Sequence, residues 1–189
     1  MTVQYYPDTL AFDTGVPGTL FNTFTTAKTM LNPNWLNTVP ANWWYIGRKV
    51  RVTVAGAISN IITTPGTLTL QYMLGSIVAV SSGVMQLSST AHTLAPFKAT
   101  CLLTCRAVGS GTSANILGQW DTVSQAITAT AVADSATSHD ILLGPATAPA
   151  VGTGFDSTVA TTMDFWAGFS ISNAGNGLQV HQYLVESLN

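Results

Sequence analysis

An alternation of apolar side chains with a mixed, mostly polar set recurs in four segments after Pro40. Apolar residues occupy every second position in three of them, and in the fourth Leu178, Val180 and Leu184 stand against Gln179, His181, Tyr183 and Val185. The segments are residues 49–55, 67–74, 163–172 and 178–186. Because successive side chains of a strand point to opposite faces, this pattern predicts strands that bury one face. Strands of this kind are typical of antiparallel sheets.

Turn-forming residues separate these segments, and helical periodicity is weak. Turns containing Gly are expected at residues 64–66, 81–83, 108–111 and 173–177. Thr, Val, Ile and Gly are too frequent for a capped helix, so only residues 34–37 and 124–136 are candidates for a helical turn. About eight strands in about 145 residues predict an all-β fold, an antiparallel β-sandwich of the jelly-roll type.

The first forty residues lack this alternation and are interrupted by Pro7, Pro17, Pro33 and Pro40. We expect residues 1–40 to form an extended N-terminal arm that lies over a neighbouring subunit. Residues 41–189 are expected to form a single sandwich domain. Disorder of the arm is not expected, because it carries too much apolar surface for a freely solvated tail. Its large side chains are Tyr5, Tyr6, Phe12, Phe21, Phe24 and Trp35.

Charged side chains are scarce along the whole chain. Asp, Glu, Lys and Arg make up 7% of the 189 residues, whereas an ordinary soluble domain uses about a quarter of its positions for them. Such a surface is usually covered by other protein, so the composition predicts a subunit of a larger assembly. No apolar run approaches the roughly 20 residues of a membrane-spanning helix, and residues 1–20 lack the pattern of a secretory signal. The net charge of −2 gives no electrostatic reason to expect nucleic acid as a partner.

The two cysteines, Cys101 and Cys105, are four positions apart. On a strand they would be separated by about 13 Å, well beyond the roughly 4.4–6.8 Å between Cα atoms that a disulfide allows. The nearest histidines, His92 and His139, form no metal-binding spacing with them. We therefore predict free thiols that pack in an apolar interior.

The sequence contains little material for catalysis. Three histidines, His92, His139 and His181, are far apart in the sequence, and no hydrolase, metalloprotease or P-loop string accompanies them. A triad of His181, Asp164 and one of many Ser or Thr residues could form by coincidence. We expect a protein that is not an enzyme, with no catalytic residue, metal or cofactor, and we interpret His181 as a structural or interface residue.

A cluster of aromatic and basic residues precedes the first alternating segment. It consists of Trp43, Trp44, Tyr45, Arg48, Lys49 and Arg51. Aromatic residues and Arg are enriched at protein interfaces, so these residues are candidate interface positions, together with Tyr5, Tyr6, Phe12 and His181. With alternating directions, Trp43 and Tyr45 face one way and Trp44 the other.

Two alternatives stay open for this cluster. The rings could form a platform for a sugar, although a buried anchor on one side and a contact with a neighbour on the other is the preferred interpretation. The basic residues could protect a strand edge from mispairing or contact acidic patches on another subunit.

Five strings resemble a family of small structural proteins of tailed bacteriophages and prophages. The first is Pro-Ala-Asn-Trp-Trp-Tyr-Ile-Gly-Arg-Lys-Val-Arg at residues 40–51, and the others are residues 63–68, 103–109, 148–157 and 181–189. The resemblance covers about residues 36–189 and carries over no catalytic residue.

The resemblance implies a virion component assembled in the cytoplasm of the bacterial host. The expected role is a jelly-roll decoration or cement protein of the capsid that forms a homotrimer and stabilises the head. Its partners would be further copies of itself and the major capsid protein or other virion subunits. The alternative role is a trimeric head domain of a tail fibre or spike that binds a host glycan or receptor.

Overall fold

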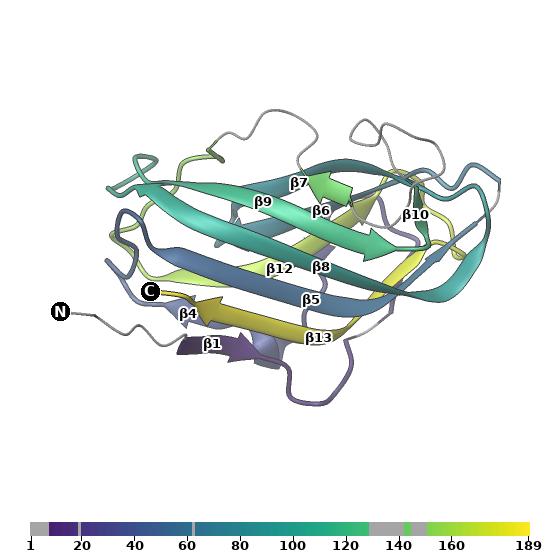
Figure 1. The fold of residues 1–189 in the computed structure, drawn as a ribbon, viewed down its shortest axis with the longest axis horizontal. Helices are drawn as coiled ribbons and strands as arrows, with labels where there is room; N and C mark the ends of the chain where they lie inside the picture. Colours follow the sequence, from purple (N-terminus) through teal and green to yellow (C-terminus); the bar gives the residue numbers. More distant parts are fainter. Residues whose placement is uncertain (1–7, 19, 62, 129–141, 145–150) are drawn as a thin grey trace.

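Two antiparallel β-sheets face each other across one hydrophobic core (Figure 1). The computed structural model describes residues 8–18, 20–61, 63–128, 142–144 and 151–189. The strands are β1 (Asp8–Phe12), β2 (Phe21–Asn22), β3 (Lys28–Thr29), β4 (Asn37–Val39), β5 (Lys49–Asn60), β6 (Thr67–Leu74), β7 (Ile77–Leu87), β8 (His92–Ala107), β9 (Asn115–Ser124), β10 (Ile127–Thr128), β11 (Leu142–Gly144), β12 (Thr161–Phe169) and β13 (Gly177–Ser187). The prediction of an all-β antiparallel sandwich is confirmed.

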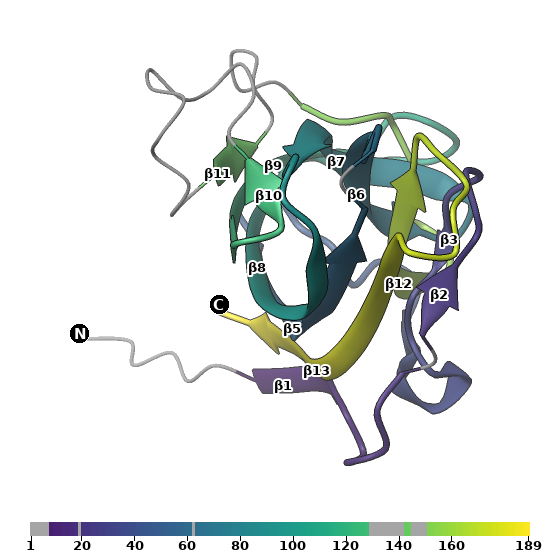
Figure 2. The same ribbon diagram turned by 90° about the vertical axis from the view of Figure 1, so that its right-hand side faces the viewer.

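The strand order places the last two long strands, β12 and β13, beside β6 and β5 from earlier in the chain. The first sheet has the order β1-β13-β5-β8-β9-β11, and β2 also pairs with β13. The second sheet has the order β10-β7-β6-β12-β3, and β4 also pairs with β12. The chain therefore crosses from the first sheet to the second between β5 and β6, and from the second to the first between β12 and β13. The two crossings are neighbours, because β12 pairs with β6 and β13 pairs with β5. Figure 2 shows both sheets curling around the space between them.

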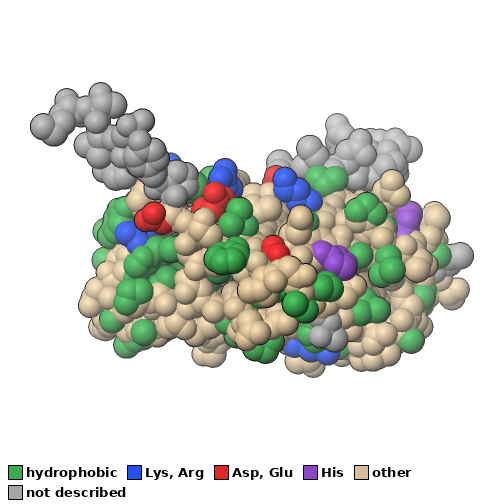
Figure 3. All heavy atoms as spheres, turned by 90° about the horizontal axis from the view of Figure 1, so that it is seen from below, with side chains coloured by type: hydrophobic (Ala, Val, Ile, Leu, Met, Phe, Trp, Pro, Cys, Tyr) green, Lys and Arg blue, Asp and Glu red, His purple; other side chains and the backbone are tan. Residues whose placement is uncertain are grey.

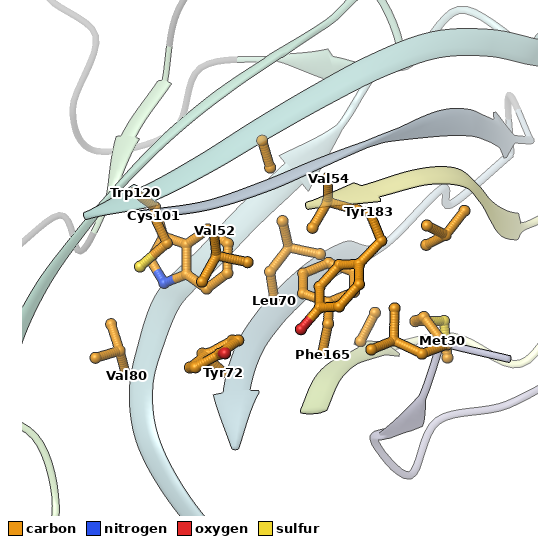
Figure 4. Packing of buried hydrophobic residues seen from close by; sticks show 14 of the residues in the cluster. Met30, Val52, Val54, Leu70, Tyr72, Val80, Cys101, Trp120, Phe165 and Tyr183 are labelled. Atoms are coloured by element: carbon orange, nitrogen blue, oxygen red, sulfur yellow. The ribbon is translucent and has the colours of Figure 1, made fainter. Parts of the chain in front are cut away.

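The inward positions of β5, β6 and β12 are the apolar positions of the alternating segments. In β5, Val50, Val52 and Val54 are buried, whereas Lys49 and Arg51 between them are exposed. In β13 the prediction is wrong after Val180, because a bulge between Val180 and Gln182 reverses the faces, so that Tyr183 and Val185 are buried and Leu184 is only partly buried. Other inward side chains include Leu70, Tyr72, Trp120, Phe165 and Tyr183, which pack between the sheets (Figure 4). No Asp, Glu, Lys or Arg is among the buried residues in the part of the chain that the structure describes. The core is therefore held by apolar burial, which is worth about 25 cal/mol per Å².

Both cysteines lie on the inward face of β8. Cys101 and Cys105 are buried free thiols, as the sequence predicts. Burial raises the pKa of the Cys101 thiol well above its ordinary value. A thiol that stays protonated and inaccessible is inert, so these residues serve packing.

One predicted turn is wrong: residues 81–83 lie inside β7. The register between β6 and β7 shifts there, and Gly83 has a φ of 72°. The Ser82 hydroxyl accepts a hydrogen bond from the Leu70 amide at 2.9 Å and donates one to the Gly83 carbonyl at 2.8 Å. A glycine with positive φ suits a β-bulge as well as a turn, and here the bulge forms.

The described part of residues 1–40 packs on its own sandwich. Strands β1 and β2 add to the first sheet along β13, and β3 and β4 add to the second along β12. Phe24, Met30 and Trp35 are buried in the common core. This segment is extended in backbone yet covered by its own chain, because its apolar side chains are buried there. Its contact with a neighbouring subunit stays a prediction.

A short 3₁₀ turn, Pro33–Trp35, lies within this segment. The side chain of Asn32 accepts a hydrogen bond from the Asn34 amide at 3.0 Å and so caps the turn. The turn begins one residue before the range that the sequence suggested. Of the second suggested range, residues 124–128 hold the end of β9 and β10 instead, and the rest lies outside the described residues.

A pair of neighbouring substitutions tests the inward and outward faces of β6. Leu70→Ala should lower the free energy of unfolding by about 2–5 kcal/mol, because Leu70 is fully buried. Thr69→Ala, on the partly exposed outer face, should change it by about 0.5 kcal/mol or less. Chemical denaturation of both variants measures this, and equal losses would contradict the assignment of the faces.

Candidate protein interface

Two tight turns shape the loop between β4 and β5, which we call the aromatic loop (residues 41–48). The Arg48 amide donates to the Tyr45 carbonyl at 3.0 Å, and Gly47 has a φ of 90°. The Trp43 amide donates to the Pro40 carbonyl at 3.2 Å, and Asn42 has a φ of 59°. Positive φ at the third residue is typical of type II turns, in which Gly and Asn are favoured. Ile46 is thereby placed at the tip of the second turn.

Backbone hydrogen bonds from distant segments fix the aromatic loop in place. The Gly47 amide donates to the Cys105 carbonyl and the Cys105 amide to the Arg48 carbonyl, both at 2.9 Å. The Asn42 amide donates to the Ser157 carbonyl at 2.9 Å. Asn189 holds the other side, because its side-chain amide donates to the Gly47 carbonyl at 3.1 Å. The loop is therefore a well-supported feature of this end of the sandwich.

The three consecutive aromatic residues alternate between buried and exposed positions. Trp44 is 4% exposed and packs edge-to-face against Phe155, with ring centroids 5.9 Å apart. Trp43 is half-buried and meets Trp44 edge-to-face at 4.9 Å. Tyr45 is 42% exposed. This agrees with the expected alternation, with Trp44 as the anchor.

Arg48 lies against the two outward rings. Its guanidinium carbon is 3.9 Å from the ring centroid of Trp43 and 4.4 Å from that of Tyr45. Both contacts are cation–π interactions, which orient the guanidinium and cover part of its surface. Its Nε atom is buried without a hydrogen-bond partner. No described carboxylate forms an ion pair with Arg48.

The other basic residues of the cluster have different environments. Arg51 forms an ion pair with Glu186 across the strands at 2.9 Å, so its charge is matched within the chain. Lys49 is exposed at the start of β5, and Arg106 is exposed near the end of β8. Arg48 and Lys49 thus share one end of the sandwich with the aromatic loop.

Exposed apolar side chains lie on the loops of this end, which we call the aromatic end (the aromatic loop with residues 108–113 and 155–160). They are Tyr45, Ile46, Val108 and Val159, and Ile46 is 66% exposed. Ile46, Val108 and Val159 were not among the interface residues predicted from the sequence. Gly47 and residues 108–111 mark turns in the sequence. An apolar side chain in or beside such a turn is expected to be exposed, as Ile46 and Val108 are.

The remaining candidate residues lie elsewhere or outside the described part. Phe12 is exposed on β1, opposite Leu184 of β13. His181 is exposed at a bulge of β13, where the register against β5 shifts. Tyr5 and Tyr6 lie outside the described residues. The structure therefore brings together Trp43, Trp44, Tyr45 and Arg48, with Lys49 adjacent, but not Phe12 or His181.

The rest of the visible surface is poor in charge. Figure 3 shows a face on which Lys, Arg, Asp and Glu are few among uncharged polar and hydrophobic side chains. This matches the composition, in which Thr, Ser, Asn and Gln fill the outward strand positions. These side chains supply hydrogen bonds without the cost of burying ions.

The opposite end of β5 carries an open polar hollow of about 680 Å³. Its lining includes Asn60, His92, Thr93 and Asn173. Asn60 is buried, and its side-chain amide donates to the carbonyls of Ser88 at 2.6 Å and Thr90 at 2.8 Å. The hollow offers hydroxyl, amide and imidazole groups and, among its described lining residues, neither a carboxylate nor an aromatic ring of Trp, Tyr or Phe.

Among the described residues, no three His, Cys, Asp or Glu side chains come together as a metal site would require. A search for apolar helices of membrane-spanning length in the same residues found none.

No protein-family model matches the sequence, and no curated protein matches it. One solved structure, the CBM2 module of the evolved Dit of Lactobacillus casei BL23 phage J-1, is similar with a TM-score of 0.37 and 11% sequence identity. The match covers 99% of each chain. Similarity at this level does not establish a common family or function.

Substitutions in the aromatic loop should separate its anchor from its outward side. Trp44→Ala should lower the free energy of unfolding by about 3–5 kcal/mol, because it empties a buried site against Phe155. Tyr45→Ala should cost about 1 kcal/mol or less, since it removes a largely exposed ring and one cation–π contact. Denaturation of the two variants measures the difference, and a greater loss for Tyr45→Ala would refute the assignment of the anchor.

Proposed function

We propose that this protein is a structural subunit of a tailed-phage virion that attaches to other virion proteins through its aromatic end. In the specific form of the proposal it is a trimeric capsid decoration protein that stabilises the head and has no catalytic activity. Its place is the assembled particle, put together in the cytoplasm of the host.

The observation that carries the proposal is the composition of the aromatic end. Tyr45 and Ile46 are exposed apolar side chains beside Arg48, a cation without an acceptor among the described residues. Aromatic residues and Arg form the energetic centre of many protein interfaces. The scarcity of charge in the chain and the resemblance of five sequence strings to phage structural proteins support the same role.

The proposed mechanism is passive. A protein that binds only the assembled state stabilises that state by mass action. Several linked copies turn weak single contacts into a strong attachment. Rigidity helps, because the aromatic loop is held by β8 and by Asn189 before any partner binds.

The test compares particles carrying two variants with a new acidic residue. Ile46→Asp places a charge at the tip of the aromatic loop and should release the protein from particles or lower their disruption temperature. Val123→Asp is the matched control, because Val123 is also an exposed apolar residue but lies on the outer face of the first sheet. Particle thermostability and protein content measure the effect.

The opposite pattern would refute the role of the aromatic end. If Val123→Asp released the protein and Ile46→Asp left the particles unchanged, attachment would have to use the outer face of the first sheet.

A second candidate function is recognition of a host glycan, and the polar hollow favours it. A neutral, hydroxyl-rich ligand would suit the amide, hydroxyl and imidazole groups of Asn173, Thr93 and His92. His92→Ala should then abolish binding to isolated host cell-wall polysaccharide, whereas Ile46→Asp should not affect it. Retention of binding in His92→Ala would contradict a glycan site in this hollow.

A further inference from the structure

The aromatic end holds two fixed charges of opposite sign that do not pair with each other. One is the Arg48 guanidinium and the other is the Asp156 carboxylate. Arg51–Glu186 is the ion pair found among the described residues, so neither Arg48 nor Asp156 has a charged partner there.

Arg48 is oriented before any partner arrives. The rings of Trp43 and Tyr45 hold its guanidinium at 3.9 and 4.4 Å, and the turn at Gly47 fixes its backbone. Its Nε atom is buried without an acceptor, so the donors open to a partner are the two Nη groups, which have no acceptor among the described residues. A planar guanidinium with unused donors matches a carboxylate, which can take two parallel hydrogen bonds.

Asp156 is oriented on the neighbouring loop. One carboxylate oxygen accepts hydrogen bonds from the Thr158 hydroxyl at 2.6 Å and the Thr158 amide at 2.8 Å, and the other accepts from the Gly111 amide at 2.9 Å. These bonds, that from the Thr158 hydroxyl first, lower the pKa of Asp156 below its usual range. The carboxylate is therefore ionised at neutral pH and has lone pairs left for a further donor.

Both groups belong to the same end because the loops that hold them are joined. Phe155 packs on Trp44, and Ser157 accepts the hydrogen bond from the Asn42 amide. Each charged group is nevertheless tied to its own loop, Arg48 by the aromatic rings and Asp156 by Thr158 and Gly111. The two charges are thus complementary between copies and unpaired within one copy.

We propose that Arg48 binds the Asp156 carboxylate of a second copy of this chain, head to tail, in a closed ring. A contact between two different patches of identical subunits either closes into a ring or extends as a filament. The exposed side chains of Tyr45, Ile46, Val108 and Val159 lie on the same end. Ring closure removes water from the ion pair, which strengthens it, and gathers these apolar side chains from the three copies, so that they can meet the particle together.

This inference rests on the proposed homotrimer and names its contact, but it can fail separately. Attachment to particles tests the proposed function, whereas association of the purified full chain tests the ring. A protein that binds particles as a monomer would retain the proposed function and lose this contact.

The experiment is a double-mutant cycle on the oligomer of the purified chain, measured by sedimentation. Wild-type protein should be a trimer at micromolar concentration. Arg48→Gln and Asp156→Asn should each weaken association by about tenfold or more. The amide oxygen that Asp156→Asn introduces can still accept both bonds from Thr158, whereas its amide nitrogen cannot accept from Gly111. The double variant should be no weaker than the weaker single variant, because both changes remove the same contact.

Lys98→Gln and Asp121→Asn are the matched controls, since both charges are exposed on the outer face of the first sheet. They should leave the trimer unchanged. Circular dichroism and thermal melting check that each variant is folded. If Arg48→Gln does not fold, the proposal is tested by Asp156→Asn and by the salt dependence of the wild-type trimer. A trimer held by this ion pair should weaken as NaCl is raised.

Three results would overturn the proposal. A wild-type monomer at micromolar concentration removes the ring altogether. If neither single substitution weakens association of the trimer, other contacts hold it. The same follows if the losses in association of the two single variants add up in the double variant.

Discussion

Every long strand of this protein buries one apolar face, and this burial holds the two sheets together. The described core contains no charged side chain, so the sandwich has few of the directional interactions that ions provide. Its stability comes from apolar area and from backbone hydrogen bonds that satisfy every strand except at the edges. The edges are then filled by the short strands β1 to β4, which lie along β13 and β12.

Charged side chains are scarce on the surface as well, and this distinguishes the aromatic end from the rest of it. Outward positions carry mostly Thr, Ser, Asn and Gln, which tolerate water and protein alike. Against this neutral background, Arg48 and Asp156 are unusual because each is held in place by neighbours and lacks an opposite charge. A charge oriented in advance costs little further ordering when a partner binds. The aromatic end is therefore the part of the surface best prepared for association.

Much of the fold was visible in the sequence, and the exceptions have physical causes. The long strands β5, β6 and β12 could be predicted with their faces because each carries its own alternation over seven or more residues, whereas the bulge in β13 reverses its faces and left no mark in the alternation. Strands β1 to β4 could not, because segments of two to five residues become strands only when β13 or β12 offers hydrogen bonds. The turn predicted at residues 81–83 was wrong because Gly83 has a positive φ that suits a turn and a β-bulge equally.

The candidate site was predictable in its residues but not in its geometry. Trp44 and Arg48 stand out in the sequence, whereas the stacking of Arg48 on two rings depends on the turn at Gly47. Asp156 could not be chosen from the sequence, because more than a hundred residues separate it from the loop beside which it folds.

Backbone hydrogen exchange of the purified chain, compared between the free and the particle-bound protein, tests whether the aromatic end is the surface that attaches to the particle. We expect amides of residues 41–48 and 155–160 to become protected on the particle, while those of β8 and β9, which are hydrogen-bonded between strands, exchange as before. Protection confined to β8 and β9, with the aromatic loop unchanged, would contradict it.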